Sequence, residues 1–156
     1  MIMNALLHFL IGTWFVTYSN FPLWTKGNKT KPTFTYTLLE RKNSPVLFDE
    51  VNYKKKGKVH TINGYDYPDK KDSTAFVWKG KGILSLLKSR WRVVLKDESG
   101  QWALIYFSKT LFTPEGVDFI SRQPSLPANV LEQVKSFMQK DSTLKKFTGE
   151  LKQINS

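Results

Sequence analysis

The sequence predicts an all-β protein: an eight-stranded up-and-down antiparallel β-barrel with a short N-terminal helix, one C-terminal amphipathic helix and a short ninth strand. Short runs of alternating apolar and polar residues, joined by short polar turns, follow one another from Thr13 to Gln123. A meander of this length leaves two unpaired edges, and closing it into a barrel removes them. The length of 156 residues fits a single domain over 1–156.

The strands are expected in order from their period-two alternation. In the first, Trp14 and Val16 alternate with Phe15 and Thr17. Asn43-Ser44-Pro45 and Lys56-Gly57-Lys58 are expected as turns between later strands. The eight strands are placed at 13–19, 33–41, 46–54, 59–65, 74–79, 83–96, 101–109 and 117–123.

Two segments have helical spacing instead. At the N-terminus Asn4 is expected to cap a short helix that Gly12 ends. At 127–141 the apolar residues recur at i, i+4 and i+7, which predicts one amphipathic helix. A short ninth strand is expected at about 147–154. The N-terminal segment has neither a basic region nor a small-residue cleavage site, so we expect a cytoplasmic protein, or a periplasmic or secreted one if a signal peptide has been removed.

Several kinds of site are excluded by composition. The chain has no cysteine, which excludes disulfides and thiolate chemistry, and only two histidines, His8 and His60. We therefore expect no metal ion, no cofactor and no Ser-His-Asp triad. Aromatic residues make up 14% of the chain, and that much ring area must fill a core or line a cavity.

The formal net charge is +11 at pH 7. This charge favours an acidic partner, such as an anionic lipid, a nucleic acid or an anionic small molecule. The alternative is that a lysine-rich surface keeps the protein soluble.

The barrel topology brings Trp14 and Arg122 together. Consecutive loops of an up-and-down barrel alternate between its two ends, and the first and eighth strands are neighbours. The root of the first strand and the end of the eighth therefore lie at the same end. A guanidinium over an indole there makes a cation–π contact that plugs the barrel, and Gly12 lets the helix pass close by.

These residues resemble a known family. Gly12-x-Trp14 at the start of the first strand, and Arg122 in the stretch SRQP before a late helix, are similar to the lipocalins of the calycin superfamily. The stretches WKGKG, SRW and WALIYFSKTLFTPEGVDFISR resemble a lipocalin-like branch of microbes and plants. The chain departs from better-known lipocalins in lacking a disulfide, a clear Thr-Asp-Tyr motif and the N-terminal Cys of membrane-anchored bacterial members.

The resemblance implies the binding and transport of a small hydrophobic ligand inside the barrel. Residues at alternating positions are then expected to face inward and line a pocket. The alternative is that they simply fill the barrel. A slip of one residue in register would turn each set outward. The expected ligand-binding residues of the wall are Tyr18, Phe34, Tyr36, Leu38, Trp78, Trp91 and Tyr106.

The end opposite Trp14 is expected to form a basic and apolar rim. Lys29 and Lys55 are its expected ligand-binding lysines, and Trp24 and Phe112 are among its apolar residues. Such a rim suits an anionic amphiphile such as a fatty acid, and transient contact with an anionic membrane. The alternative is a solvated lysine-rich surface. Nucleic acid is not an expected partner, because the aromatic residues are predicted to face inward where bases could not stack. The oligomeric state is left open.

An enzyme is the second hypothesis. Asp118 interrupts an apolar strand on the same face as Arg122, so its carboxylate is expected to be buried. A structural partner would satisfy it. Alternatively, Asp118 with Tyr36 or Tyr106 would act as acid and base on a lipophilic substrate. Asp66 is expected in a turn, and His60 as a plain strand residue.

Overall fold

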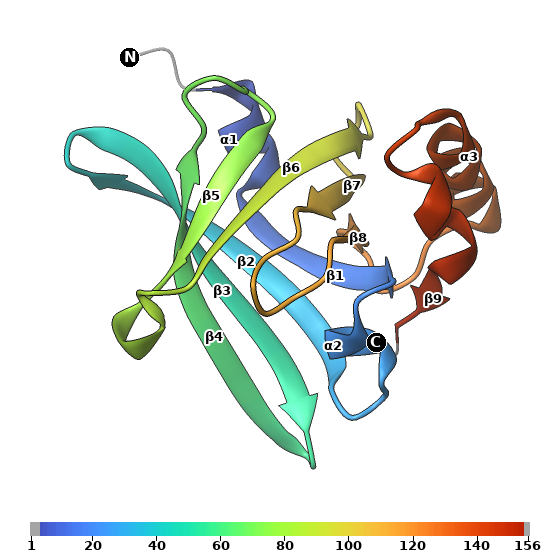
Figure 1. Cartoon of the computed structure of the whole chain (residues 1–156), viewed down its shortest axis with the longest axis horizontal. Helices are drawn as coiled ribbons and strands as arrows, with labels where there is room; N and C mark the ends of the chain where they lie inside the picture. The colour runs from blue at the N-terminus through green and yellow to red at the C-terminus, as the bar shows by residue number, and fades with distance from the viewer. Residues whose placement is uncertain (1–3, 155–156) are drawn as a thin grey trace.

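The structure is a computed structural model that describes residues 4–154, and it confirms the predicted barrel (Figure 1). Consecutive strands pair antiparallel, and β1 pairs with both β8 and β2, which closes the sheet. The eight barrel strands are β1 Gly12–Ser19, β2 Thr30–Arg41, β3 Ser44–Lys55, β4 Lys58–Pro68, β5 Ala75–Gly80, β6 Lys88–Lys96, β7 Trp102–Phe107 and β8 Gly116–Ser121.

The turn between β2 and β3 differs from the prediction. Lys42 and Asn43 both have positive φ, 51° and 59°, as a two-residue hairpin turn requires. Pro45, expected in the turn, lies within β3 opposite Glu40. Proline is tolerated there because the pairing of β3 with β4 begins only at Leu47, so no neighbouring strand needs its missing N–H. Between β5 and β6 the prediction also fails, because residues 82–84 form the short 3-10 helix η1 (Gly82–Leu84) and β6 begins only at Lys88.

The strand β1 has three partners. Its first half pairs with β2 at Gly12 to Phe15, and its second half pairs with the short strand β9 (Lys152–Gln153) at Tyr18 and Ser19. The predicted ninth strand is thus real but much shorter than 147–154. Most of that segment belongs to the 3-10 helix η2 (Lys145–Glu150), whose Phe147 and Thr148 are buried.

Three α-helices complete the described chain. The helix α1 (Ala5–Leu10) begins as predicted at Asn4, whose side chain accepts a hydrogen bond from the Leu6 amide. The helix α3 (Ala128–Lys140) lies on the outer surface of the barrel, and α2 (Pro22–Thr25), which the sequence did not predict, follows β1 (Figure 1). Within residues 4–154, none of the helices has the length and apolarity needed to cross a membrane.

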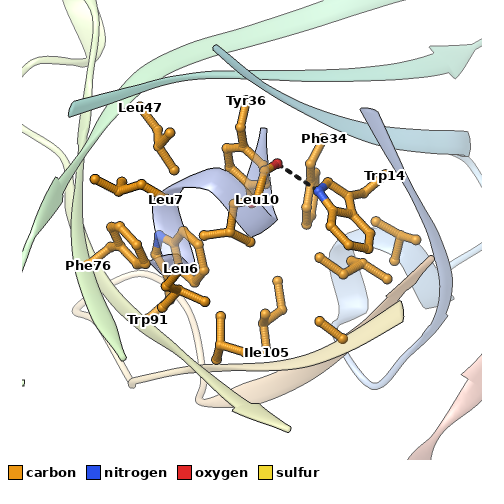
Figure 2. Packing of buried hydrophobic residues seen from close by; sticks show 14 of the residues in the cluster. Leu6, Leu7, Leu10, Trp14, Phe34, Tyr36, Leu47, Phe76, Trp91 and Ile105 are labelled. Carbon is orange, nitrogen blue, oxygen red and sulfur yellow. Dashed lines mark hydrogen bonds between the residues drawn. The ribbon is translucent and has the colours of Figure 1, made fainter. Parts of the chain in front are cut away.

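The apolar residues form two cores, one on each side of the barrel wall. Figure 2 shows the inner core, where Leu6, Leu7 and Leu10 of α1 lie inside the ring of strands. The outer core joins β7 and β8 to α3 and η2, and it consists of Leu104, Val117, Phe119, Val134, Met138, Leu144 and Phe147. One end of the barrel is therefore filled by α1, and one side is covered by α3.

Candidate ligand-binding site

The closed end of the barrel is held by Trp14 and Arg122. The Arg122 guanidinium carbon lies 3.5 Å from the Trp14 ring centroid, and the Trp14 indole nitrogen donates a hydrogen bond of 2.9 Å to the Leu10 carbonyl (Figure 2). Arg122 also donates to the carbonyls of Phe9, Ile11 and Thr13. The predicted contact between strand root and strand end is confirmed, and it ties α1 to the wall.

The other end of the barrel opens into a cavity of about 550 Å³. This volume falls within the range of about 300–1,000 Å³ that is usual for small-molecule sites. The lining is mainly apolar, and its aromatic residues include Phe34, Tyr36, Trp78, Trp91 and Phe107. The barrel is therefore hollow above α1 rather than filled throughout.

Three loops form the mouth of the cavity. The loop after β1 contributes Trp24, and the loop after β7 contributes Leu111 and Phe112. The third loop contributes Leu86 just before β6 and Lys88 as the first residue of β6. Leu86, Leu111 and Phe112 are 91%, 96% and 80% exposed, so large apolar side chains stand in solvent around the opening. Trp24 is the exception, because it is buried and lies edge-on to Tyr53.

Four of the predicted wall residues line the cavity: Phe34, Tyr36, Trp78 and Trp91. Trp78 can lie there because its indole covers Gly64, where an added Cβ would come within 2.2 Å of the indole nitrogen. Leu38 packs against the inner core but does not line the cavity.

Tyr18 and Tyr106 were predicted to face inward, and the structure places both on the outside of the barrel. A register shift in β1 pairs Val16 with Ile120 but Tyr18 with Phe119, so the side chains after Val16 change face. Tyr18 then packs edge-on against Phe119 beneath α3.

Tyr106 also packs in the outer core, where its hydroxyl donates a 2.5 Å hydrogen bond to Glu115. Burial, with the Glu115 hydrogen bond and charge, raises the Tyr106 pKa to about 12. Glu115 in turn accepts from Lys146 of η2. Since Tyr106 lies outside and Asp118 inside, these two residues do not form the acid–base pair that the sequence suggested.

The predicted rim lysines, Lys29 and Lys55, do not line the cavity. The ammonium of Lys29 lies 5.8 Å from the ring centroid of Tyr53, and Lys55 is half-buried at the end of β3. Lys88 is the lysine that borders the cavity itself.

Three buried carboxyl groups belong to the barrel interior: Asp49, Asp66 and Asp118. Asp49 and Asp118 line the cavity. Asp118 faces inward as predicted and accepts a 2.5 Å hydrogen bond from Ser19. The prediction for Asp66 was wrong, because it lies within β4, is fully buried and accepts a 2.7 Å hydrogen bond from the Trp91 indole.

Burial weakens the acidity of all three carboxyl groups. It raises the Asp118 pKa to about 7, although hydrogen bonds from Ser19 and Trp24 oppose it. Burial likewise raises the Asp66 pKa to about 7, and hydrogen bonding to Trp91 opposes it. The pKa of Asp49 is raised well above its ordinary value by burial and by the neighbouring Asp66. Burial and these three aspartates also raise the pKa of Tyr36.

Asp49 is a site residue that the sequence analysis missed, as it missed Phe107 and Lys88. The two-residue turn at Lys42 and Asn43 sets Tyr36 directly opposite Asp49. Once β2 places Tyr36 inside, this register places Asp49 inside too. A correct placement of the turn at Lys42 and Asn43 would therefore have predicted that Asp49 faces inward.

The sequence matches no family model and no curated protein. Its structure is similar to that of lobster apocrustacyanin A1, with a TM-score of 0.70 and 11% identity over 96% of this chain and 78% of that one. It is equally similar to the siderocalin Ex-FABP, with a TM-score of 0.70 and 12% identity over 95% of each chain. Both are lipocalins, and the siderocalin is described as functioning through dual ligand specificities. The lipocalin fold implied by Gly12, Trp14 and Arg122 is confirmed.

Proposed function

We propose that this protein binds and carries a small hydrophobic ligand inside its barrel. The observation that carries the proposal is the cavity of about 550 Å³, walled by Phe34, Trp78 and other aromatic residues and open at one end. Burying a ligand chain against these rings removes apolar surface from water on both partners. The binding role that the lipocalin neighbours' names suggest is consistent with this geometry.

We further propose that the ligand is an amphiphile with an anionic head, such as a fatty acid. Its chain would occupy the cavity and its head would remain at the mouth. Support comes from Lys88 at the opening, from Lys29 in the loop before β2, from Lys55 at the end of β3, and from the net charge of +11. Asp49 and Asp66 favour the same orientation, because an anionic head at the closed end would lie beside acidic groups.

The open end is also proposed to touch an anionic membrane while the ligand is loaded. Ile83, Leu86 and Leu111 are each more than 90% exposed, and Lys81 and Lys109 adjoin them in sequence. Apolar side chains beside lysines are suited to insert among lipid head groups.

Cosedimentation tests the membrane contact. The protein is expected to sediment with phosphatidylglycerol vesicles and not with phosphatidylcholine vesicles. Leu111→Asp should abolish sedimentation. Leu39→Asp is the control, because Leu39 is also an exposed leucine but lies beside the opposite hairpin. Equal sedimentation of wild type and Leu111→Asp would contradict the contact.

Native mass spectrometry of freshly purified protein, followed by organic extraction, tests the carrier function. A stoichiometric lipid or acid is the expected result, and its identity gives the ligand class. An unliganded mass that does not change after incubation with fatty acids, retinoids or sterols would contradict the proposal.

One observation favours a second candidate, acid–base chemistry on a lipophilic substrate. Asp118 and Tyr36 both line the cavity, and burial raises the Asp118 pKa to about 7, a value suited to proton transfer near neutral pH. An Asp118→Asn variant distinguishes the candidates. A carrier should bind its extracted ligand nearly as well with this variant, whereas an enzyme should lose turnover of it.

A further inference from the structure

Two buried carboxyl groups lie near the inner end of the cavity: Asp49 lines it, and its neighbour Asp66 is fully buried and does not. Asp49 stands opposite Tyr36, and Tyr36 pairs with Gly12 at the closed end of β1, so Asp49 lies deep in the barrel. Its neighbour Asp66 lies on the adjacent strand β4 opposite Leu47, two residues nearer the closed end than Asp49. Asp118, by contrast, pairs with Ser19 at the open end of β1.

Two oxygens of this pair lack hydrogen-bond partners among residues 4–154. They are Oδ1 of Asp49 and Oδ2 of Asp66, and both are shielded from solvent. Asp49 as a whole is only 7% exposed, yet it lines the cavity. A buried acceptor without a donor is costly, so each such atom in a folded protein calls for an explanation. A proton shared between the two carboxyls, which hydrogen bonds them to each other, accounts for these two oxygens and leaves the part of Asp49 that lines the cavity for a ligand.

The protein brings no cation to this end of the cavity. Among the described residues that line it, Lys88 is the one basic side chain, and Lys88 begins β6 at the mouth. Burial raises the pKa of both Asp49 and Asp66, and the charge of Asp66 raises the pKa of Asp49 further, so the pair retains a proton. The pair can therefore donate a hydrogen bond as well as accept one.

We propose that Asp49, supported from behind the cavity wall by Asp66, forms a subsite for a hydroxyl group on the inner part of the ligand chain, so that the preferred ligand is a hydroxylated amphiphile. This proposal rests on the proposed carrier function. A hydroxyl can donate to the part of the Asp49 carboxyl that lines the cavity, while Asp66 holds that carboxyl in place through the proton that the pair shares. A positively charged amine would also satisfy the carboxyls, but it would have to pass the lysine-bearing mouth.

The test is a calorimetric comparison of three ligands: palmitic acid, its ω-hydroxy derivative and its ω-amino derivative. We expect wild-type protein to bind the ω-hydroxy acid about tenfold more tightly than palmitic acid, as one hydrogen bond to a buried acceptor would give. Equal or tighter binding of palmitic acid would overturn the subsite. Tightest binding of the ω-amino acid would overturn it in favour of an amine site.

Two variants locate the effect. Asp49→Leu should remove the preference, so that both acids bind alike, and it should bind palmitic acid at least as well as wild type. Glu50→Gln is the matched control, because Glu50 adjoins Asp49 on β3, does not line the cavity and should keep the tenfold ratio. If Asp49→Leu keeps the ratio, the subsite is wrong. If Asp49→Leu fails to fold, the three ligands with wild-type protein still test the subsite. Asp49→Asn serves as the second variant, and it should show a smaller ratio of ω-hydroxy acid affinity to palmitic acid affinity.

The carrier function can fail separately from the subsite. If wild-type protein binds none of the three acids, both proposals fall for this class of ligand. If it binds all three equally, the carrier function stands and only the subsite falls.

Discussion

The guanidinium of Arg122 stacks on the indole of Trp14, 3.5 Å from its centroid, and joins the end of β8 to the root of β1. Its nitrogens also hold the carbonyls of Phe9 and Ile11, so the same side chain anchors the end of α1. Burial lowers the Arg122 pKa, but an arginine stays charged well above neutral pH. The pair therefore acts as the floor beneath the cavity at every working pH.

Trp14→Ala should destabilise the protein by about 3–5 kcal/mol, because Trp14 is fully buried and a large cavity would be left at the floor. Urea unfolding followed by circular dichroism measures the change. A variant that unfolds at the wild-type midpoint would show that Trp14 is not the floor.

Gly64→Ala should destabilise the protein by about 1–3 kcal/mol, the usual cost of overpacking. Its new methyl group would meet the Trp78 indole at 2.2 Å, so Trp78 must move and its fluorescence should change. Gly149→Ala is the control, because nothing lies within 4 Å of the position of its Cβ. Equal stability of the two variants would mean that Trp78 does not cover Gly64.

The protein should be more stable at about pH 5 than at about pH 8. Asp66 and Asp118 have pKa values raised from 3.8 to about 7, so between these values the folded state binds more protons than the unfolded state. Their contribution is complete below about pH 4 and is lost as the pH rises through 7. Asp69 and Asp97 have lowered pKa values, so their contribution to stability changes with pH only below this window.

Thermal unfolding across this window measures the effect. Asp118→Asn should flatten the slope, since the amide does not titrate and can still accept the Ser19 hydrogen bond. A stability that rises from pH 5 to pH 8 would contradict the assignment of buried, protonated carboxyls.

Ligand affinity should distinguish the inner tyrosine and tryptophan residues from the outer ones. Trp78→Ala should weaken binding of an extracted ligand by roughly tenfold or more, because it removes a large apolar contact from the wall. Tyr18→Phe and Tyr106→Phe should leave affinity unchanged, because both side chains lie in the outer core. Fluorescence titration measures all three, and an effect of Tyr18→Phe alone would contradict the placement of the cavity.

The sequence predicted the strand order, both ends of the barrel and the Trp14–Arg122 contact, because these follow from alternation and from the count of strands. The sequence-based prediction of which side chains face inward failed where one extra residue shifts the pairing of a strand. The shift in β1 moved Tyr18 outside, and no composition signal marks that shift. Tyr106 was misplaced because β7 is buried on both faces: Leu104 and Ile105 are equally inaccessible, so alternation of polarity does not identify the inner face.

The interior carboxyls were harder to predict. Asp66 sits between aromatic residues and a proline, where aspartate commonly marks a turn, and only the Trp91 hydrogen bond reveals its buried role. Similarly, β9 pairs with β1 only at Tyr18 and Ser19, and a local pattern does not show how short such a strand is.

The three partners of β1 also bear on the timing of folding. The strand is made early in synthesis, yet it pairs with β8, about a hundred residues later, and with β9 at Lys152 and Gln153. Contacts so distant in the chain close slowly, because a long loop must first be ordered. Until the segment up to Gln153 has been made, the second half of β1 has no neighbour on its β9 side. During synthesis the barrel is thus an open sheet that leaves aromatic residues of its inner face in contact with water. In this interval the chain is most prone to aggregate and most dependent on chaperones.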